Sequence, residues 1–248
     1  MNRLFGQAVA VVVLGVVATA FTPACAENDQ SIFIRNVLAP AQNRQNGQCV
    51  YTADTTQVFQ SEGLLDVGIA DTYVATLLVG NQLIARGNTQ SVRAESNRAR
   101  LNGAVVRITD PGGGVISEFT ALGSGFVDPA QNNLPSYSPF FVTALDPASI
   151  QRIAQDVPVG QSRLLVANIK VFGQTLGGVD LESGEFQYPI RVCNGCLVSF
   201  ATGDDPATPA IDCTLPLPDN AQGQPCVAGQ DETTPCQLCR GRPVCDSR

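Results

Sequence analysis

The cysteines of this chain constrain its fold more than any other feature. Seven of the nine lie in the last 56 residues, from Cys193 to Arg248. This stretch is rich in proline and turn residues and poor in apolar ones, so it cannot bury enough surface to fold unaided. Cross-links must hold it, and we predict a disulfide-rich tail over residues 193–248. Its cysteines are Cys193, Cys196, Cys213, Cys226, Cys236, Cys239 and Cys245.

The N-terminus indicates export. An apolar run covers residues 8–21 and follows Arg3, the only charged side chain before Glu27. The run is shorter than the roughly 20 residues that span a bilayer, and it fits the h-region of a signal peptide. The rest of the chain has no second run of that length, so we expect no membrane span in the mature protein.

Two cleavage sites compete after this run. Ala24-Cys25-Ala26 is an A-x-A site, and cleavage there would release a soluble protein. The tetrapeptide Thr-Pro-Ala-Cys that ends at Cys25 resembles a bacterial lipobox, although its first two residues depart from the usual Leu and small residue. We favour lipidation of Cys25, which makes residues 1–24 a lipoprotein-type signal peptide and residues 25–30 a tether to the membrane.

Cleavage after Ala26 removes Cys25, and lipidation occupies its thiol. Either way eight cysteines remain for pairing, an even number that allows up to four disulfides in an oxidising compartment. The tail holds seven of them, and the eighth is Cys49. If all eight are oxidised within one chain, Cys49 must pair with a tail cysteine. The tail is then expected to fold back near Cys49 rather than extend as a stalk. The partner stays open, because eight cysteines allow about 105 pairings.

Residues 31–192 are predicted to form an all-β domain. β-branched and alternating stretches recur at residues 31–39, 72–84, 98–110, 115–122, 138–145, 162–176 and 184–193. The sequence Asp-Pro-Gly-Gly-Gly at 110–114 predicts a turn between two of them, and Gly80-Asn81 suits a bend or bulge. This spacing favours an antiparallel β-sandwich or barrel, and we choose the sandwich.

One short helix is expected within that domain. Asp146 can cap it, and Pro147 suits its first position. The apolar residues Ile150, Ile153, Ala154 and Val157 then fall on one face before Pro158 ends it. This helix should close one end of the sheets.

Several stretches carry a resemblance to a known family. "CAENDQSIFIRNV", "LLVGNQLIARG" and "FQYPIRVCNGCLVSF" together resemble the uncharacterised cysteine-rich envelope lipoproteins of myxobacteria and their relatives. The resemblance implies an envelope lipoprotein with Cys25 as the lipidated residue, and it implies no activity. The "LLVGNQL" strand and the long strand after it are also similar to Ig-like sandwiches of the water-stress and late-embryogenesis type.

Two C-x-x-C pairs are the strongest candidates for chemistry. A thiol oxidoreductase places such a pair at a helix N-terminus, which lowers the pKa of one thiol. Here Cys193-Asn-Gly-Cys196 ends a predicted strand and Cys236-Gln-Leu-Cys239 lies in the Pro-rich tail, so we expect disulfide half-cystines. A zinc site of four thiolates is the other interpretation, but the 39 residues between the pairs exceed the usual spacing of roughly 15–20.

The remaining residues favour a protein without catalytic, cofactor or metal residues. Histidine is absent, which excludes Ser-His-Asp and Cys-His hydrolases and histidine metal ligands. The carboxylate pairs Asp204-Asp205, Asp180/Glu182 and Asp231-Glu232 lie in predicted turns. Calcium binding by the loop at 128–133, "DPAQNN", stays open, although the loop lacks the EF-hand pattern.

A function follows as an expectation. We expect a non-enzymatic structural or adhesion-like module of the bacterial cell envelope, anchored in the outer membrane, whose partner is an envelope protein or a polysaccharide. The formal charge of −7 argues against nucleic acid as a partner. The alternatives are an envelope thiol-disulfide enzyme that uses one C-x-x-C pair, or a secreted soluble protein cleaved after Ala26.

Overall fold

A computed structural model describes residues 31–41, 48–87, 94–200, 213 and 224–246. The predicted signal peptide, the tether and lipidation of Cys25 lie outside the described residues. Within the described part of the chain, no helix is long and apolar enough to cross a membrane.

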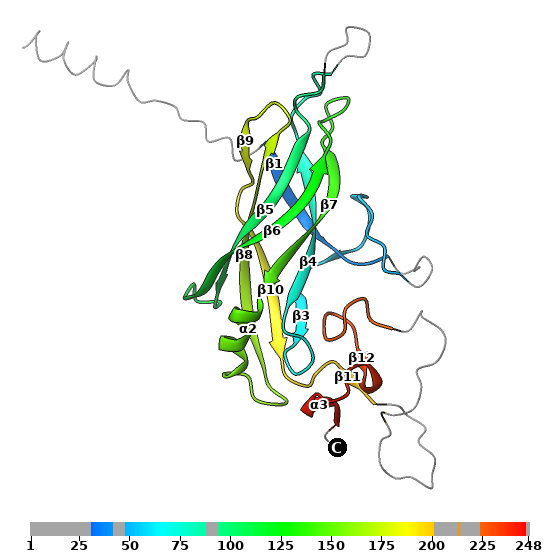
Figure 1. The fold of residues 1–248 in the computed structure, drawn as a ribbon, viewed down its shortest axis with the longest axis vertical. Helices are drawn as coiled ribbons and strands as arrows, with labels where there is room; N and C mark the ends of the chain where they lie inside the picture. Colours follow the sequence, from blue (N-terminus) through cyan, green and yellow to red (C-terminus); the bar gives the residue numbers. More distant parts are fainter. Residues whose placement is uncertain (1–30, 42–47, 88–93, 201–212, 214–223, 247–248) are drawn as a thin grey trace, which may run out of the picture.

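The fold is mostly β and is built from two main sheets (Figure 1). The four-stranded sheet has the order β2-β1-β4-β7, and all its pairs are antiparallel. Its strands are β1 (Ile32–Leu38), β2 (Phe59–Gln60), β4 (Tyr73–Asn81) and β7 (Ser136–Leu145).

The six-stranded sheet has the order β3-β10-β8-β5-β6, and β9 pairs with β8 beside this path. Its strands are β3 (Gly63–Asp66), β5 (Ala99–Thr109), β6 (Val115–Val127), β8 (Ser162–Thr175), β9 (Asp180–Glu182) and β10 (Phe186–Cys193). The short β3 runs parallel to β10, which differs from the all-antiparallel prediction. A four-residue strand carries too little pattern for its direction to be read from sequence.

The two sheets enclose one apolar core. Alternate residues of each strand point inward, as the period of two in a β-strand requires. Leu77 and Val79 of β4 and Ile169 and Val171 of β8 are completely buried in it. Burial of each large apolar side chain stabilises the fold by about 1.5–3 kcal/mol.

The six-stranded sheet bends toward the other sheet along β6. Small residues on its inner face permit this approach, because a Cβ added at Gly123 would lie 2.8 Å from the ring of Phe140 on β7. Ser117 of β6 and Ser149 also join their hydroxyl groups at 2.7 Å. The edge strands β6 and β7 therefore lie side by side and close one flank of the core (Figure 1).

The predicted turn and helix are both present. The backbone N–H of Asp110 donates to Gly114 O at 2.9 Å and closes the turn between β5 and β6. Helix α2 (Pro147–Ala154) begins with Asp146, whose carboxylate accepts the Ser149 N–H at 3.0 Å as an N-cap. Ile150 and Ile153 bury the inner face of the helix against the core.

The bend or bulge predicted at Gly80-Asn81 is absent. Gly80 sits in regular register with both neighbouring strands, so it forms no bulge, and the strand ends at Asn81. Glycine is required there because an added Cβ would overlap the ring of Phe33. The irregularity in the pairing of β4 with β7 lies instead at its start, between Tyr73 and Val74.

The described part of the tail forms a small unit at one end of the sheets (Figure 1). It contains β11 (Val198–Ser199), β12 (Thr234–Pro235), the 3-10 helix η2 (Cys236–Leu238) and helix α3 (Pro243–Asp246). Its buried cluster combines Ile69 of the body with Leu197, Val244 and three cysteines. The single helix expected from sequence is thus joined by a second, very short one, which has no amphipathic repeat to reveal it.

Candidate functional site

All eight predicted cysteines are disulfide-bonded. Cys49 pairs with Cys226, with their Cα atoms 5.8 Å apart, as the parity argument requires. The other bonds are Cys193–Cys196, Cys213–Cys236 and Cys239–Cys245. The Cys49–Cys226 bond ties the segment between β1 and β2 to the folded-back tail.

The first C-x-x-C pair surrounds a buried carboxylate. Asp66, at the end of β3, is completely buried and lies close to Cys193 and Cys196. It accepts backbone N–H bonds from Gly195 at 2.8 Å and Leu197 at 2.9 Å. No helix follows this pair, since the chain continues into β11, so the carboxylate organises a structural loop.

The second C-x-x-C pair forms no bond within itself. Cys236 joins Cys213, and Cys239 joins Cys245. Both cysteines of the motif are buried in the tail cluster. The four cysteines of the zinc interpretation therefore belong to three different disulfides, and none of them is a free thiolate that could bind zinc.

The tail is seated on the body by backbone and side-chain hydrogen bonds. Gln230 contacts both sheets. Its backbone forms an antiparallel bridge with Leu65 of β3, and its side-chain amide donates to Val74 O of β4 at 2.9 Å and accepts from Val74 N at 3.0 Å. Asp231 exchanges bonds with Leu64, one through its backbone and one through its carboxylate, each at 2.8 Å. The open edge of β3 and the start of β4 are thus covered by the tail.

A buried tyrosine pair completes this seat. The hydroxyl of Tyr73 lies 3.0 Å from that of Tyr188, and it donates to the Asp231 carboxylate. Burial raises the pKa of both tyrosines, and the neighbouring Asp231 carboxylate raises them further. Burial also raises the pKa of Asp231, against the lowering effect of its hydrogen-bond donors. These groups hold the tail in place through hydrogen bonds between β4, β10 and Asp231.

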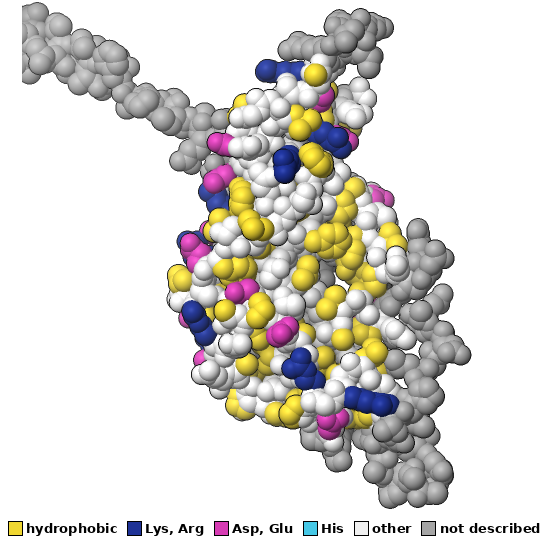
Figure 2. All heavy atoms as spheres, in the orientation of Figure 1, with side chains coloured by type: hydrophobic (Ala, Val, Ile, Leu, Met, Phe, Trp, Pro, Cys, Tyr) yellow, Lys and Arg dark blue, Asp and Glu magenta, His cyan; other side chains and the backbone are white. Residues whose placement is uncertain are grey.

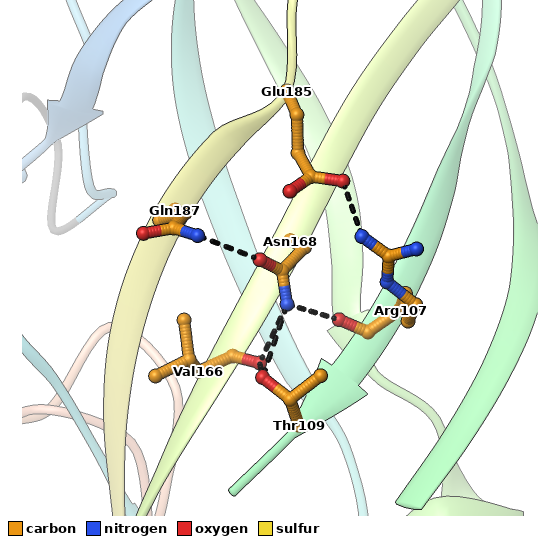
Figure 3. Close-up of polar contacts among 6 residues, drawn as sticks. All are labelled: Arg107, Thr109, Val166, Asn168, Glu185 and Gln187. Atoms are coloured by element: carbon orange, nitrogen blue, oxygen red, sulfur yellow. Dashed lines mark hydrogen bonds and ion pairs between the residues drawn. The ribbon is translucent and has the colours of Figure 1, made fainter. Parts of the chain in front are cut away.

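The outer face of the six-stranded sheet carries a polar ladder across β5, β8 and β10 (Figure 3). Asn168 is 6% exposed, and its Nδ2 donates to Arg107 O at 3.1 Å, while Gln187 donates to its Oδ1 at 3.2 Å. Arg107 pairs with Glu185 at 2.6 Å, and Lys170 pairs with Glu182 at 3.1 Å. The polar groups of this face pair with one another, as is common on the outer face of a sheet, and such exposed ion pairs add little stability.

The other carboxylates predicted from sequence have ordinary roles. Asp180 accepts from Gln174 at 2.7 Å, and Glu232 accepts from the Cys226 N–H at 2.6 Å. Asp128 of the "DPAQNN" loop pairs with Arg98 at 2.9 Å. Asp204 and Asp205 lie outside the described residues. Charges of both signs are scattered over the visible surface, with apolar side chains between them (Figure 2).

The most promising site is a groove on the outer face of the four-stranded sheet. It has a volume of about 540 Å³ and lies between the segment after Cys49 and the loop before β7. Its lining residues are Arg35, Ala53, Asp54, Thr55, Leu134, Pro135 and Tyr137. We call it the Arg35 groove.

Cross-strand stacking builds the floor of the Arg35 groove. Gly80 of β4 separates Phe33 of β1 from Tyr137 of β7, and the two rings meet edge to face at 5.9 Å. The Arg35 guanidinium lies over the Tyr137 ring, 5.5 Å from its centroid, and donates to the Tyr137 hydroxyl at 3.2 Å. Among the described residues, Arg35 has no carboxylate partner.

The wall of the groove is held in several ways. Asp54 closes a tight turn, in which its Oδ1 accepts from both the N–H and the hydroxyl of Thr56 at 2.8 Å. These bonds lower the pKa of Asp54, so the carboxylate is charged at neutral pH. Tyr51 packs edge-on against Phe141 of β7 at 5.6 Å. Together with the Cys49–Cys226 bond, these contacts fix the wall over the sheet.

A second depression continues the groove past Pro135, which lines both. It has a volume of about 250 Å³ and is lined by Gln82, Ile84, Ala130, Asn133 and Pro135. Sequence reasoning missed both depressions, because Arg35 and Tyr137 are 102 residues apart and each is unremarkable in its own strand. Knowledge of the strand order would have been needed to bring them together.

No protein-family model, curated protein or solved structure matches this chain.

Proposed function

We propose that this protein is a non-enzymatic binding or structural module of the bacterial cell envelope, anchored by lipid on Cys25 and related to the myxobacterial cysteine-rich lipoproteins. In this proposal the two sheets form an Ig-like sandwich, and the tail seals one end. The N-terminal apolar run followed by Cys25 supports the anchor, and the four disulfides suit an oxidising compartment.

One observation carries the binding role, namely the Arg35 groove. A charged and aromatic floor lies on a rigid sheet, and a disulfide-tethered segment forms the wall. Preformed concave sites of this kind lose little conformational entropy when a partner binds. Cys236 and Cys239 each pair with a cysteine outside their motif, and the Cys193–Cys196 bond is followed by β11 rather than by the helix that activates a catalytic thiol, which favours a binding role over the thiol-enzyme alternative.

Fractionation of cells tests the anchor. The wild-type protein is expected in the outer-membrane fraction, and Cys25→Ser is expected in the soluble fraction, since acyl chains contribute about 0.8 kcal/mol per buried CH₂. Mass spectrometry of the purified N-terminus provides the matching readout. An unmodified N-terminus at Glu27 would show that the protein is secreted in soluble form.

An insulin-reduction assay tests the absence of thiol catalysis. We expect no turnover by the purified oxidised protein in the presence of dithiothreitol, beyond the background of the reductant itself. Turnover that Cys193→Ser abolishes would establish the thiol-disulfide enzyme instead.

A further inference from the structure

We propose that the Arg35 groove binds a neutral polysaccharide, an uncharged hydroxyl-rich polymer, with one sugar unit over Arg35 and Tyr137. This inference rests on the proposed function as a binding module and gives it a class of ligand.

The charges of the groove favour an uncharged ligand. Arg35 and Asp54 line the same space, so the cation and the carboxylate nearly balance. The whole chain carries a formal charge of −7, and an acidic polymer would be repelled as it approached. A hydroxyl-rich polymer meets neither obstacle.

Arg35 and Asp54 can together bind two neighbouring hydroxyl groups of a sugar. The Arg35 guanidinium has five N–H donors in a planar fork, and only one bond, to the Tyr137 hydroxyl, is made among the described residues. Asp54 accepts two bonds from Thr56, out of about four that a carboxylate can accept. A sugar hydroxyl can accept from Arg35 while its neighbour donates to Asp54.

The apolar lining suits the C–H faces of a sugar ring. Leu134, which is 69% exposed, and Pro135 form one side of the groove, and the Tyr137 ring lies in its floor. Tyrosine and proline present such surface at a low entropic cost, because they have few rotatable bonds.

The shape of the site indicates a polymer rather than a single sugar. The second depression shares Pro135 with the Arg35 groove, and it is lined by Asn133, an exposed residue with a side-chain amide. Amides can both donate and accept hydrogen bonds from hydroxyl groups. An extended chain can therefore lie across both depressions.

Binding of defined polysaccharides to the full mature protein tests the proposal. The probes are soluble glucan, galactomannan, xyloglucan and dextran, with polygalacturonate as the acidic comparison, in affinity gel electrophoresis. We expect retardation by at least one neutral polymer, unchanged by 0.5 M salt in the gel as a roughly charge-independent interaction requires. Retardation by none of the four, or stronger retardation by polygalacturonate, would overturn the proposal.

Paired variants locate the binding site. Arg35→Ala and Tyr137→Ala are each expected to weaken binding at least tenfold, while Arg152→Ala, which removes an exposed arginine from α2, should leave it unchanged. Leu134→Glu, at an exposed position on the rim, is a further test that does not depend on the floor remaining folded. Equal binding by Leu134→Glu and the wild type would also overturn the proposal. Cell fractionation is independent of these results, so a failure here leaves the anchored module standing.

Discussion

The sheets and the tail are stabilised by different forces. The sheets bury many complete apolar side chains in one core, whereas half of the buried cluster of the tail consists of Cys236, Cys239 and Cys245. The difference follows from size, because a short segment buries too little apolar area to offset its conformational entropy. Cross-links and polar bonds to the body supply what the tail lacks.

The largest effect that would test this contrast is the loss of the bond between the two regions. Replacing Cys49 and Cys226 together by Ala is expected to lower the free energy of unfolding by about 5 kcal/mol, because the bond spans 177 residues and restricts the unfolded chain. Urea unfolding at pH 7 measures the change. A loss below about 1 kcal/mol would mean that the hydrogen bonds of Gln230 and Asp231 hold the tail without the disulfide.

Hydrogen exchange of the same variant separates the two contributions. The amides of Leu64, Val74 and Asp66 donate to tail residues, so their protection reports tail docking. We expect these amides to lose protection while those in the centre of β8 keep theirs.

A core substitution tests the other side of the contrast. Val171→Ala, at a completely buried position of β8, is expected to cost about 2–3 kcal/mol through lost apolar burial and a residual cavity. Val105→Ala is the matched control, since Val105 is 37% exposed on the outer face, and it should cost less than about 1 kcal/mol. Similar costs for the two would contradict a core that depends on burial.

The shortest disulfides should contribute less. Replacing Cys193 and Cys196 by Ala is expected to cost about 2 kcal/mol, because the bond closes a loop across a separation of only 3 residues. The Asp66 carboxylate still holds this loop through Gly195 and Leu197. Urea unfolding should rank this variant clearly above the Cys49/Cys226 variant in stability, and the reverse order would refute the entropic account.

Alkaline pH should destabilise the fold gradually, through the buried Tyr73 that bonds Asp231 of the tail. The pKa of Tyr73 is raised in the folded protein, so above pH 10 the unfolded state releases a proton that the folded state retains. Stability is therefore complete below about pH 10 and falls as the pH rises above it, by about 1.4 kcal/mol per pH unit for this group. Tyr73→Phe is expected to remove that share of the slope between pH 10 and 12, and to leave the slope below pH 9 unchanged.

Local patterns were sufficient to predict most strands, the turn at 110–114 and the capped helix α2. Alternation, glycine clusters and Asp146-Pro147 act within a few residues, and the structure confirms these elements. Parity alone assigned Cys49 to the tail, but it could not choose Cys226 among the tail cysteines, since every choice satisfies the same count.

The candidate site was beyond the reach of the same reasoning. Arg35, Asp54 and Tyr137 come from three separate segments, and only the order β1-β4-β7 and the fold of the 48–58 segment bring them together. Gln230 was equally hidden, because a glutamine in a polar tail gives no sign that its side-chain amide will pair with the backbone of Val74 on β4. Long-range contacts of this kind depend on the register of the completed fold.

The position of Cys226 has a consequence for how the chain is made. Synthesis proceeds from the N-terminus, so Cys49 meets Cys193, Cys196 and Cys213 as potential partners before its own partner arrives. A chain interrupted between residues 213 and 226 lacks the partners of both Cys49 and Cys213, and it also lacks the residues that cover the edge of β3. Such a product can form a non-native Cys49–Cys213 bond or cross-link to another chain through Cys49, and this reactivity distinguishes incomplete molecules from finished ones.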